Sequence, residues 1–204
     1  MNKKKLSGSI KTKTKTIIGI DYSLTSPAVC ITDDCKFKNS HFYYLTNRKK
    51  YVGKMMKNIE GFEHEEYTDN IKRFKNISTF VFNVIGKHIS PKIGHRSINK
   101  IFIEGYSFGS KGQGLFQIAE NCGILKYRLM NSNIPYETIV PSVIKKGATG
   151  KGNADKDKMY EAFCKDTKTD LKKVFDTEKV GNPISDIVDS FYIAKLGYEN
   201  INSK

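Results

Sequence analysis

Residues 17–23, with the sequence Ile-Ile-Gly-Ile-Asp-Tyr-Ser, decide the fold of this chain. A short apolar run that ends on a carboxylate is typical of a buried strand that reaches the edge of its sheet. Residues 101–107, Ile-Phe-Ile-Glu-Gly-Tyr-Ser, repeat this pattern. We expect the two strands to lie side by side and parallel, which would bring Asp21 and Glu104 to one edge. At the carboxyl ends of parallel strands, α/β proteins build their sites.

A third acidic element is expected on a helix near the end of the chain. Asp186 and Asp189 are three residues apart, so on a helix they share a face. Asp186 also has a purely structural explanation, because an acid in the first turn is stabilised by the helix dipole and Ser185 is a candidate N-cap. Asp189 lies further in among apolar neighbours and is explained less well in this way.

Four clustered carboxylates repel one another unless a cation neutralises them. Oxygen ligands of this kind suit Mg²⁺ or Mn²⁺. Two such ions, about 3.5–4 Å apart, can activate a water and stabilise the leaving oxygen of a phosphodiester. The acidic residues therefore predict a two-metal centre that holds Asp21, Glu104, Asp186 and Asp189 as ligands.

The overall charge favours a polyanionic partner. The 204 residues carry 35 Lys and Arg against 21 Asp and Glu, a formal net charge of +14. Neutralising phosphates releases condensed counterions, which favours nucleic acid, although a generally lysine-rich composition remains the alternative. The four cysteines form no Cys-x-x-Cys pair and the four histidines are scattered, so no structural zinc site is expected, and reduced, partly buried thiols in a reducing compartment explain the cysteines. No apolar run is long enough to span a membrane or to serve as the core of a signal peptide.

Periodicity and turn residues predict three strands, a helix, a strand, a helix, a strand and then helices. This order indicates an α/β domain with a mixed five-stranded sheet and helices on both faces. Residues 1–15 are expected to be a basic, disordered arm, 16–200 the folded domain, and 46–67 a loop or insertion. The expected strands are 17–21, 28–32, 41–45, 101–104 and 136–140, and the expected helices are 68–87, 115–130, 154–163, 171–175 and 185–196, with Asn153 and Ser185 as N-caps and Gly197 as the final stop.

From Ile17 to Tyr198, the chain resembles the RuvC-type Holliday-junction resolvases of the ribonuclease H-like nuclease superfamily. That family has an acid after the first strand, a Glu after the fourth, and Asp-x-x-Asp in the final helix. The segment 143–156 also resembles the family's lysine- and glycine-containing segment. In that segment, Lys145 and Lys156 match two lysines that act near the scissile phosphate.

The resemblance implies a ribonuclease H-like fold and a homodimeric, structure-selective endodeoxyribonuclease that resolves four-way DNA junctions with paired nicks. The cut would depend on Mg²⁺ or Mn²⁺, with two ions per site. An aromatic residue follows the Glu in this family, and here Tyr106 and Phe108 bracket that place. Other candidates for nucleic-acid contacts are the basic residues Lys111, Lys145, Lys146, Lys151 and Lys156.

Alternative functions stay open at this point. A nuclease of the same superfamily with a different branched or hybrid substrate is one, and a non-catalytic nucleic-acid-binding module of the same fold is another. We expect a cytoplasmic location, at a nucleoid or a viral or phage replication site, with a mitochondrial location as a minor alternative. A P-loop around 150–152 and a dinucleotide fingerprint around 109–114 are excluded because their further required residues are absent.

Overall fold

Seven strands form one mixed sheet in the order β4-β5-β3-β2-β1-β6-β7. The structure, a computed structural model, describes residues 15–89, 97–106 and 113–203. β2 and β4 run antiparallel to the other strands, which are parallel to one another. The strands are β1 (Lys15–Asp21), β2 (Ala28–Thr32), β3 (His41–Thr46), β4 (Gly53–Met56), β5 (Ile59–Glu63), β6 (Ser97–Glu104) and β7 (Tyr136–Ile139).

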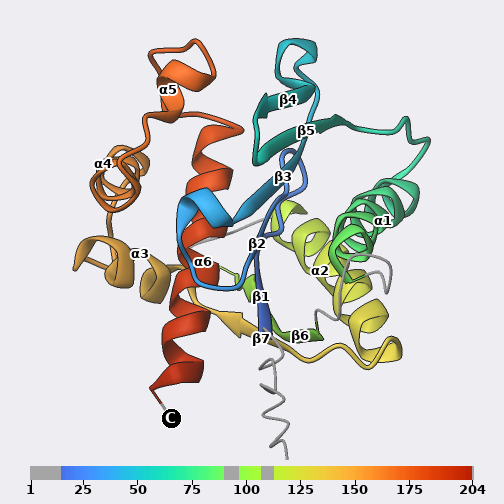
Figure 1. Ribbon diagram of the computed structural model, residues 1–204. Coiled ribbons are helices and arrows are strands. Elements are labelled where there is room, and N and C mark those ends of the chain that lie inside the picture. Colours follow the sequence, from blue (N-terminus) through green and yellow to red (C-terminus); the bar gives the residue numbers. More distant parts are fainter. Residues whose placement is uncertain (1–14, 90–96, 107–112, 204) are drawn as a thin grey trace, which may run out of the picture.

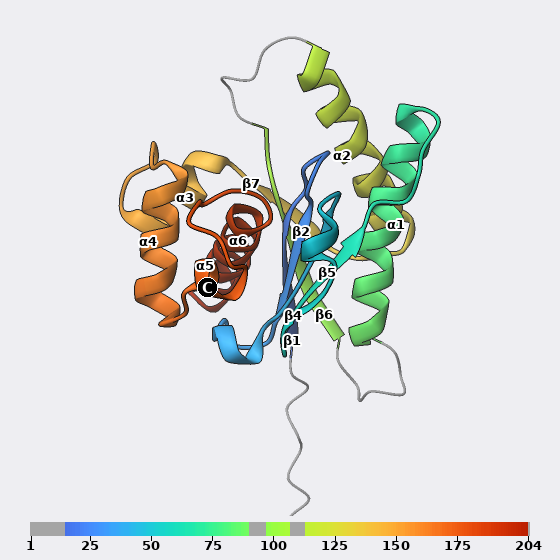
Figure 2. The same cartoon turned by 90° about the horizontal axis from the view of Figure 1, so that it is seen from above.

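Helices cover both faces of this sheet (Figures 1 and 2). One face carries α1 and α2, and the other carries α3 to α6. The helices are α1 (Asn70–Ile89), α2 (Gln113–Asn131), α3 (Pro141–Thr149), α4 (Lys156–Thr167), α5 (Leu171–Val174) and α6 (Ile184–Asn202), with 3-10 turns η1 (Phe37–Asn39) and η2 (Lys49–Tyr51). The predicted α/β class, with helices on both faces, is confirmed.

Alternation along β1 divides the core into two layers. Ile17 packs toward α6, whereas Ile18 and Ile20 pack toward α1 and α2. Successive side chains of a strand point to opposite faces, so a strand covered on both sides is apolar throughout. At Gly19, a Cβ atom would meet the backbone of α6 at Ser190 and Ala194. The glycine therefore lets α6 lie directly on β1.

The expected five-stranded sheet has two further strands. They come from 46–67, which the sequence predicts to be a loop or insertion, and they form the hairpin β4–β5 at the sheet edge. β5 pairs in parallel with β3, so the insertion extends the sheet itself. Its strands are short, and although β5 contains Ile59 and Phe62, both strands also contain Gly with Lys or Glu, residue types that are depleted in strands.

Several helix boundaries also differ from the sequence expectations. α3 is not among the expected helices, although Pro141 at its first position is a helix-start signal. α4 begins at Lys156, and Asp155 rather than Asn153 caps it by accepting a hydrogen bond from the Lys158 amide. No side-chain cap precedes α6, whose flanking residue is Pro183 and not Ser185.

The last helix continues through the expected stop at Gly197. A Cβ atom there would fall into the ring of Phe102 on β6. Gly197 is therefore required for the close approach of α6 to the sheet and not for helix termination.

The basic arm falls almost wholly outside the described residues, which begin at Lys15. No helix within the described ranges has both the length and the apolar character that crossing a bilayer requires.

Candidate active site

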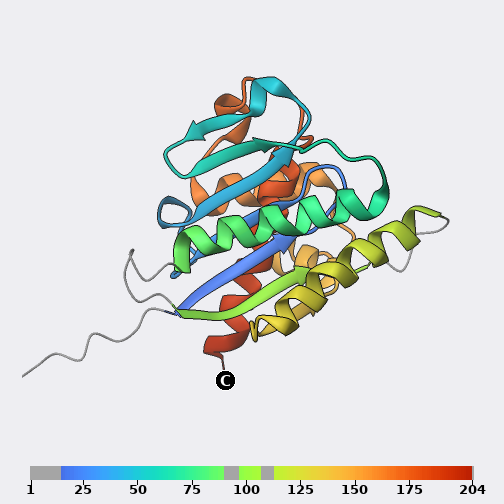
Figure 3. The same cartoon turned by 90° about the vertical axis from the view of Figure 1, so that its right-hand side faces the viewer.

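β1 and β6 run side by side in parallel (Figure 3), and this pairing places Asp21 and Glu104 at the same end of the sheet. Ile20 is opposite Ile103 in the register, and each carboxylate follows directly in its own strand. The predicted parallel pairing of these two strands is therefore confirmed. Asp21 is buried, and Glu104 is half-buried.

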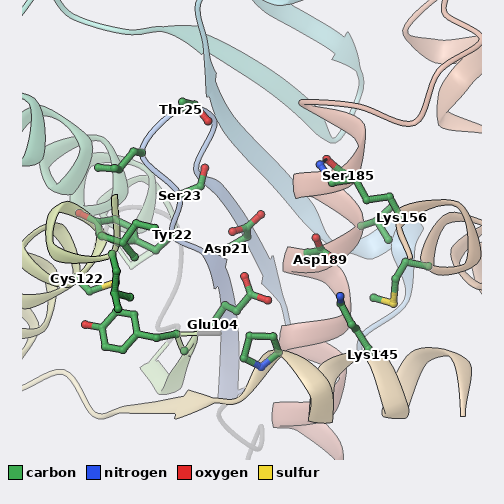
Figure 4. A pocket seen from close by; sticks show the side chains of 18 of the residues that line it. Asp21, Tyr22, Ser23, Thr25, Glu104, Cys122, Lys145, Lys156, Ser185 and Asp189 are labelled. Carbon is green, nitrogen blue, oxygen red and sulfur yellow. Dashed lines mark hydrogen bonds between the residues drawn. The ribbon is translucent and has the colours of Figure 1, made fainter. Parts of the chain in front are cut away.

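α6 brings the other two carboxylates to this edge. Asp189 is directed toward Asp21 and Glu104 across a shared space (Figure 4). Asp186 sits one turn earlier and is only 6% exposed. Its Oδ1 accepts a hydrogen bond from the Ser185 hydroxyl at 3.3 Å, and its buried Oδ2 has no partner among the described residues. We call Asp21, Glu104, Asp186 and Asp189 the acidic cluster.

A cavity of about 490 Å³ opens beside the acidic cluster. Asp21, Glu104 and Asp189 line it, whereas the buried Asp186 is not among its lining residues. The polar lining also includes two of the lysines predicted from the sequence, Lys145 and Lys156. Much of the remaining wall is apolar and comes from the loop after β1, from the residues that follow β6 and from α2, with Tyr22, Leu24, Tyr106, Leu115, Ile118 and Cys122.

Burial raises the pKa of every carboxyl group in the acidic cluster, and repulsion between the carboxylates adds to this effect at Asp21, Glu104 and Asp189. Burial raises the pKa of Asp21 well above its usual range, and the charges of Asp186, Glu104 and Asp189 raise it further. Burial raises the pKa of Asp186 to about 6. It raises the pKa of Asp189 to about 7, with added repulsion from Glu104 and Asp186. Burial also raises the pKa of Glu104, against the opposing charge of Lys145.

Two lysines approach the cavity from the α3–α4 side. Lys145 stands on α3, half-buried, and its ammonium group points toward Glu104 and Asp189 (Figure 4). Lys156 opens α4 and donates a hydrogen bond to the Ser185 hydroxyl at 3.3 Å. Ser185, expected only as a helix cap, therefore links Lys156 to Asp186.

The other residues predicted to contact nucleic acid lie at varying distances from the cavity. Lys146 and Lys151 are exposed on the same α3–α4 side, outside the cavity lining. Tyr106 lines the cavity, is 39% exposed, and has the Lys126 ammonium 5.2 Å from its ring centre. Phe108 and Lys111 lie outside the described residues.

Sequence reasoning missed the apolar wall of the cavity. Tyr22 directly follows Asp21, so its place beside the site could have been found from the motif. Its hydroxyl is buried without a partner among the described residues. Cys122 gives no such signal, because a small apolar residue in a helix is explained equally well by core packing.

The donor chemistry of the acidic cluster fits Mg²⁺ or Mn²⁺. All the candidate ligands are carboxylates, and the unpartnered Oδ2 of Asp186 adds a buried acceptor. Within the described ranges, however, no three Asp, Glu, His or Cys side chains stand close enough together to hold a metal ion as they are. Metal binding stays a prediction, and it requires these carboxylates to turn toward one another.

Comparison with known proteins identifies the fold. No protein family model matches the chain, and no curated protein matches it. Thermus thermophilus RuvC matches with 12% identity and a TM-score of 0.55, over 92% of this chain and 96% of that chain.

Two further solved structures agree. T. thermophilus RuvC in complex with a Holliday junction substrate matches with 13% identity and a TM-score of 0.57, over 93% of this chain and 97% of that chain. The yeast mitochondrial Holliday junction resolvase Ydc2 matches with 14% identity and a TM-score of 0.51, over 94% of this chain and 84% of that chain. The chain therefore resembles the RuvC-type resolvases and has their ribonuclease H-like fold.

Proposed function

We propose that this protein is a metal-dependent endonuclease that resolves four-way DNA junctions by paired phosphodiester nicks, and so serves DNA recombination and repair. One observation carries the proposal. Carboxylates from β1, β6 and α6 face a single cavity that Lys145 and Lys156 flank. The solved structures that share this fold include a RuvC bound to a Holliday junction substrate.

In this proposal the acidic cluster holds two divalent cations. When bound, such ions supply an activated water and stabilise the leaving oxygen of a phosphodiester. Lys145 and Lys156 counter the negative charge that develops on the phosphate during the displacement. Lys146 and Lys151 bind the phosphate backbone without reading bases, and Tyr106 or Phe108 stacks on an unpaired base.

We further propose a homodimer that works on DNA in the cytoplasm, at a nucleoid or a viral replication site. A four-way junction is a symmetric substrate that needs two matched cuts, which a two-fold symmetric pair of active sites supplies. The long helices α1 and α2, on the face away from α6, are the candidate interface.

A gel assay with an end-labelled mobile four-way junction tests the reaction and the substrate together. We expect symmetric nicks in Mg²⁺ and none in EDTA, and much slower cutting of an RNA–DNA hybrid of the same length. Preferred cutting of the hybrid would favour the other nuclease function. Absence of metal-dependent cutting of either substrate would contradict the proposal.

Asp189→Asn tests the role of the acidic cluster. We expect the cleavage rate of the variant to fall by about a thousandfold or more, because in this proposal the Asp189 carboxylate holds a cation that stabilises the transition state. Junction binding should stay close to that of the unmodified protein, because the lysines are retained. The matched control is Asp157→Asn, which makes the same chemical change at an exposed site on α4 outside the cavity lining. Continued cutting by Asp189→Asn would remove this residue from the site.

A further inference from the structure

The insertion that adds β4 and β5 to the sheet begins with a strongly basic turn. Residues 47–52, which we call the basic turn, have the sequence Asn-Arg-Lys-Lys-Tyr-Val. Arg48, Lys49 and Lys50 are exposed. No acidic residue occurs between His41 and Asn58. Within the described part of the chain, no carboxylate forms an ion pair with any of these three cations.

Topology places the basic turn at the edge of the sheet that carries the acidic cluster. β3 runs parallel to β1, because both pair antiparallel with β2. The basic turn follows the end of β3, so it leaves the sheet at the end where β1 finishes with Asp21. β3 lies two strands from β1, which is about 10 Å at the ordinary spacing of strands.

Packing fixes the basic turn in place. Tyr51 is buried, and its ring meets the ring of Phe175 edge-on with centres 5.3 Å apart. The Tyr44 hydroxyl donates a hydrogen bond to the Tyr51 carbonyl at 2.5 Å. Gly61 of β5 lies against that carbonyl and the Tyr44 ring, where a Cβ atom would clash. The lysines are thus presented on an anchored turn.

The basic turn also contacts the segment that leads into α6. Arg48 donates a hydrogen bond from a guanidinium nitrogen to the Asn182 carbonyl at 3.4 Å. α6 begins two residues later and carries Asp186 and Asp189. The lysine beside the anchor, Lys50, has its ammonium 4.7 Å from the ring centre of Tyr51 and remains exposed.

We infer that the basic turn binds the phosphate backbone of a duplex DNA arm next to the cleavage site. This inference rests on the proposed function and assigns a role to the insertion. B-form DNA carries one negative charge per about 1.7 Å of its axis, so a duplex that reaches Asp21 has several phosphates within about 10 Å. Lysines on a fixed turn that have no carboxylate partner among the described residues suit such contacts, which hold the backbone and carry no sequence information.

The test compares two double charge reversals. Lys49→Glu with Lys50→Glu alters the basic turn. Lys38→Glu with Lys57→Glu is the matched control. Both lysines are exposed, Lys38 in η1 between β2 and β3 and Lys57 in the turn between β4 and β5, and both turns lie at the end of the sheet away from Asp21. Binding of each protein to a four-way junction and to a linear duplex is measured without divalent metal, across a salt series.

We expect the basic-turn variant to bind the junction about tenfold more weakly at about 0.15 M salt, and its salt slope to fall by about two. The control variant should match the unmodified protein in salt slope. The cleavage rate at saturating junction concentration should stay within about twofold in both variants, because contacts that bind substrate and transition state equally change the affinity and not the rate at saturation. A third variant, Lys49→Arg with Lys50→Arg, keeps both positive charges and should bind the junction as tightly as the unmodified protein.

The outcomes separate this inference from the proposed function. Equal salt slopes for the two reversals would overturn the inference, even if the protein cuts junctions as proposed. If the protein binds junction and duplex with the expected slope difference but cuts nothing, the inference stands and the nuclease proposal fails. Absence of any DNA binding by the unmodified protein would overturn both.

Discussion

The carboxyl groups of the acidic cluster lose solvation on folding and lie close to like charges. Burial raises the pKa of Asp186 to about 6 and the pKa of Asp189 to about 7. The folded protein therefore binds protons that the unfolded chain has already released above about pH 4. Since stability falls with pH wherever the folded state binds more protons, these groups destabilise the metal-free fold progressively between about pH 4 and pH 7.

We predict that the melting temperature of the metal-free protein reflects this loss. Deprotonation of Asp186 and Asp189 should lower this melting temperature as the pH rises from about 5 to about 8. Mg²⁺ should raise the melting temperature strongly at about pH 8 and little at about pH 5, since protons compete for the same oxygens. Differential scanning fluorimetry measures both effects.

Asp189→Asn provides the comparison for this pH dependence. The amide does not titrate, so the variant should lose less stability as the pH rises and should gain less from Mg²⁺. A variant with an unchanged pH profile and an unchanged response to Mg²⁺ would contradict the prediction.

Residue-level reasoning from the sequence was most successful where a carboxylate ends a strand. Asp21 and Glu104 follow directly from apolar runs of matching form, and parallel pairing then brings them together. The two aspartates of α6 were harder to place. Residues three apart on a helix differ by about 60° in direction, so a shared face does not mean a shared surface. Asp189 lines the cavity, while Asp186 is buried and is not part of the lining.

At the level of elements, sequence periodicity predicted the long amphipathic helices well. The sequence places Ile71, Phe74, Ile77, Val81, Val84 and Ile85 at helical spacing, and α1 buries all of them except Ile71, which is 63% exposed. The weak points were short elements. α3 has nine residues with one buried apolar side chain, Ile144, so its period could not be detected. Lys145 stands on α3. Because the sequence does not predict this helix, it gives no structural reason for Lys145 to point toward the acidic cluster.

The close packing of α6 on β6 depends on Gly197, and a paired substitution tests it. Gly197→Ala should destabilise the protein by about 1–3 kcal/mol, because the new methyl group would fall into the buried ring of Phe102. Gly86→Ala, on α1, is the matched control. Its Cβ atom would meet nothing within 4 Å, so it should stabilise by about 0.5–1 kcal/mol.

Urea denaturation of the two alanine variants measures both free energies. Opposite signs are the expected result. If Gly197→Ala were neutral or stabilising, α6 and β6 would not be in the close contact that brings Asp189 and Glu104 to the same cavity.

For the whole molecule, the sequence predicted the sheet's central pairing and the helical layers but not its full width. The central strands are apolar because they are covered on both faces, and this signal is strong. The added hairpin lies at the edge of the sheet, where partial exposure permits polar residues and weakens the strand signal. The sequence therefore located the candidate site better than the surface around it.

The outer face of α2 exposes apolar side chains that a monomer would leave in water. Phe116, Tyr127 and Met130 are 70%, 62% and 59% exposed. They are separated by 11 and 3 residues, close to whole turns of a helix, so they lie along one face. Exposed apolar side chains gathered in this way are typical of interaction surfaces. This face supports the proposal that α2 contributes to a homodimer interface.

We predict that Tyr127→Glu with Met130→Glu converts a dimer into a monomer, because charges placed within an apolar interface lose hydration without gaining partners. Sedimentation equilibrium measures the mass. On a four-way junction the variant should make single nicks that are no longer paired in time. Val52→Glu is the control for the mass alone, because Val52 belongs to the basic turn; it is an exposed apolar residue that precedes β4, far from α2, and its substitution should leave the mass unchanged. A monomeric unmodified protein that still makes paired cuts would contradict the dimer, and a variant that remains dimeric would place the interface away from this face of α2.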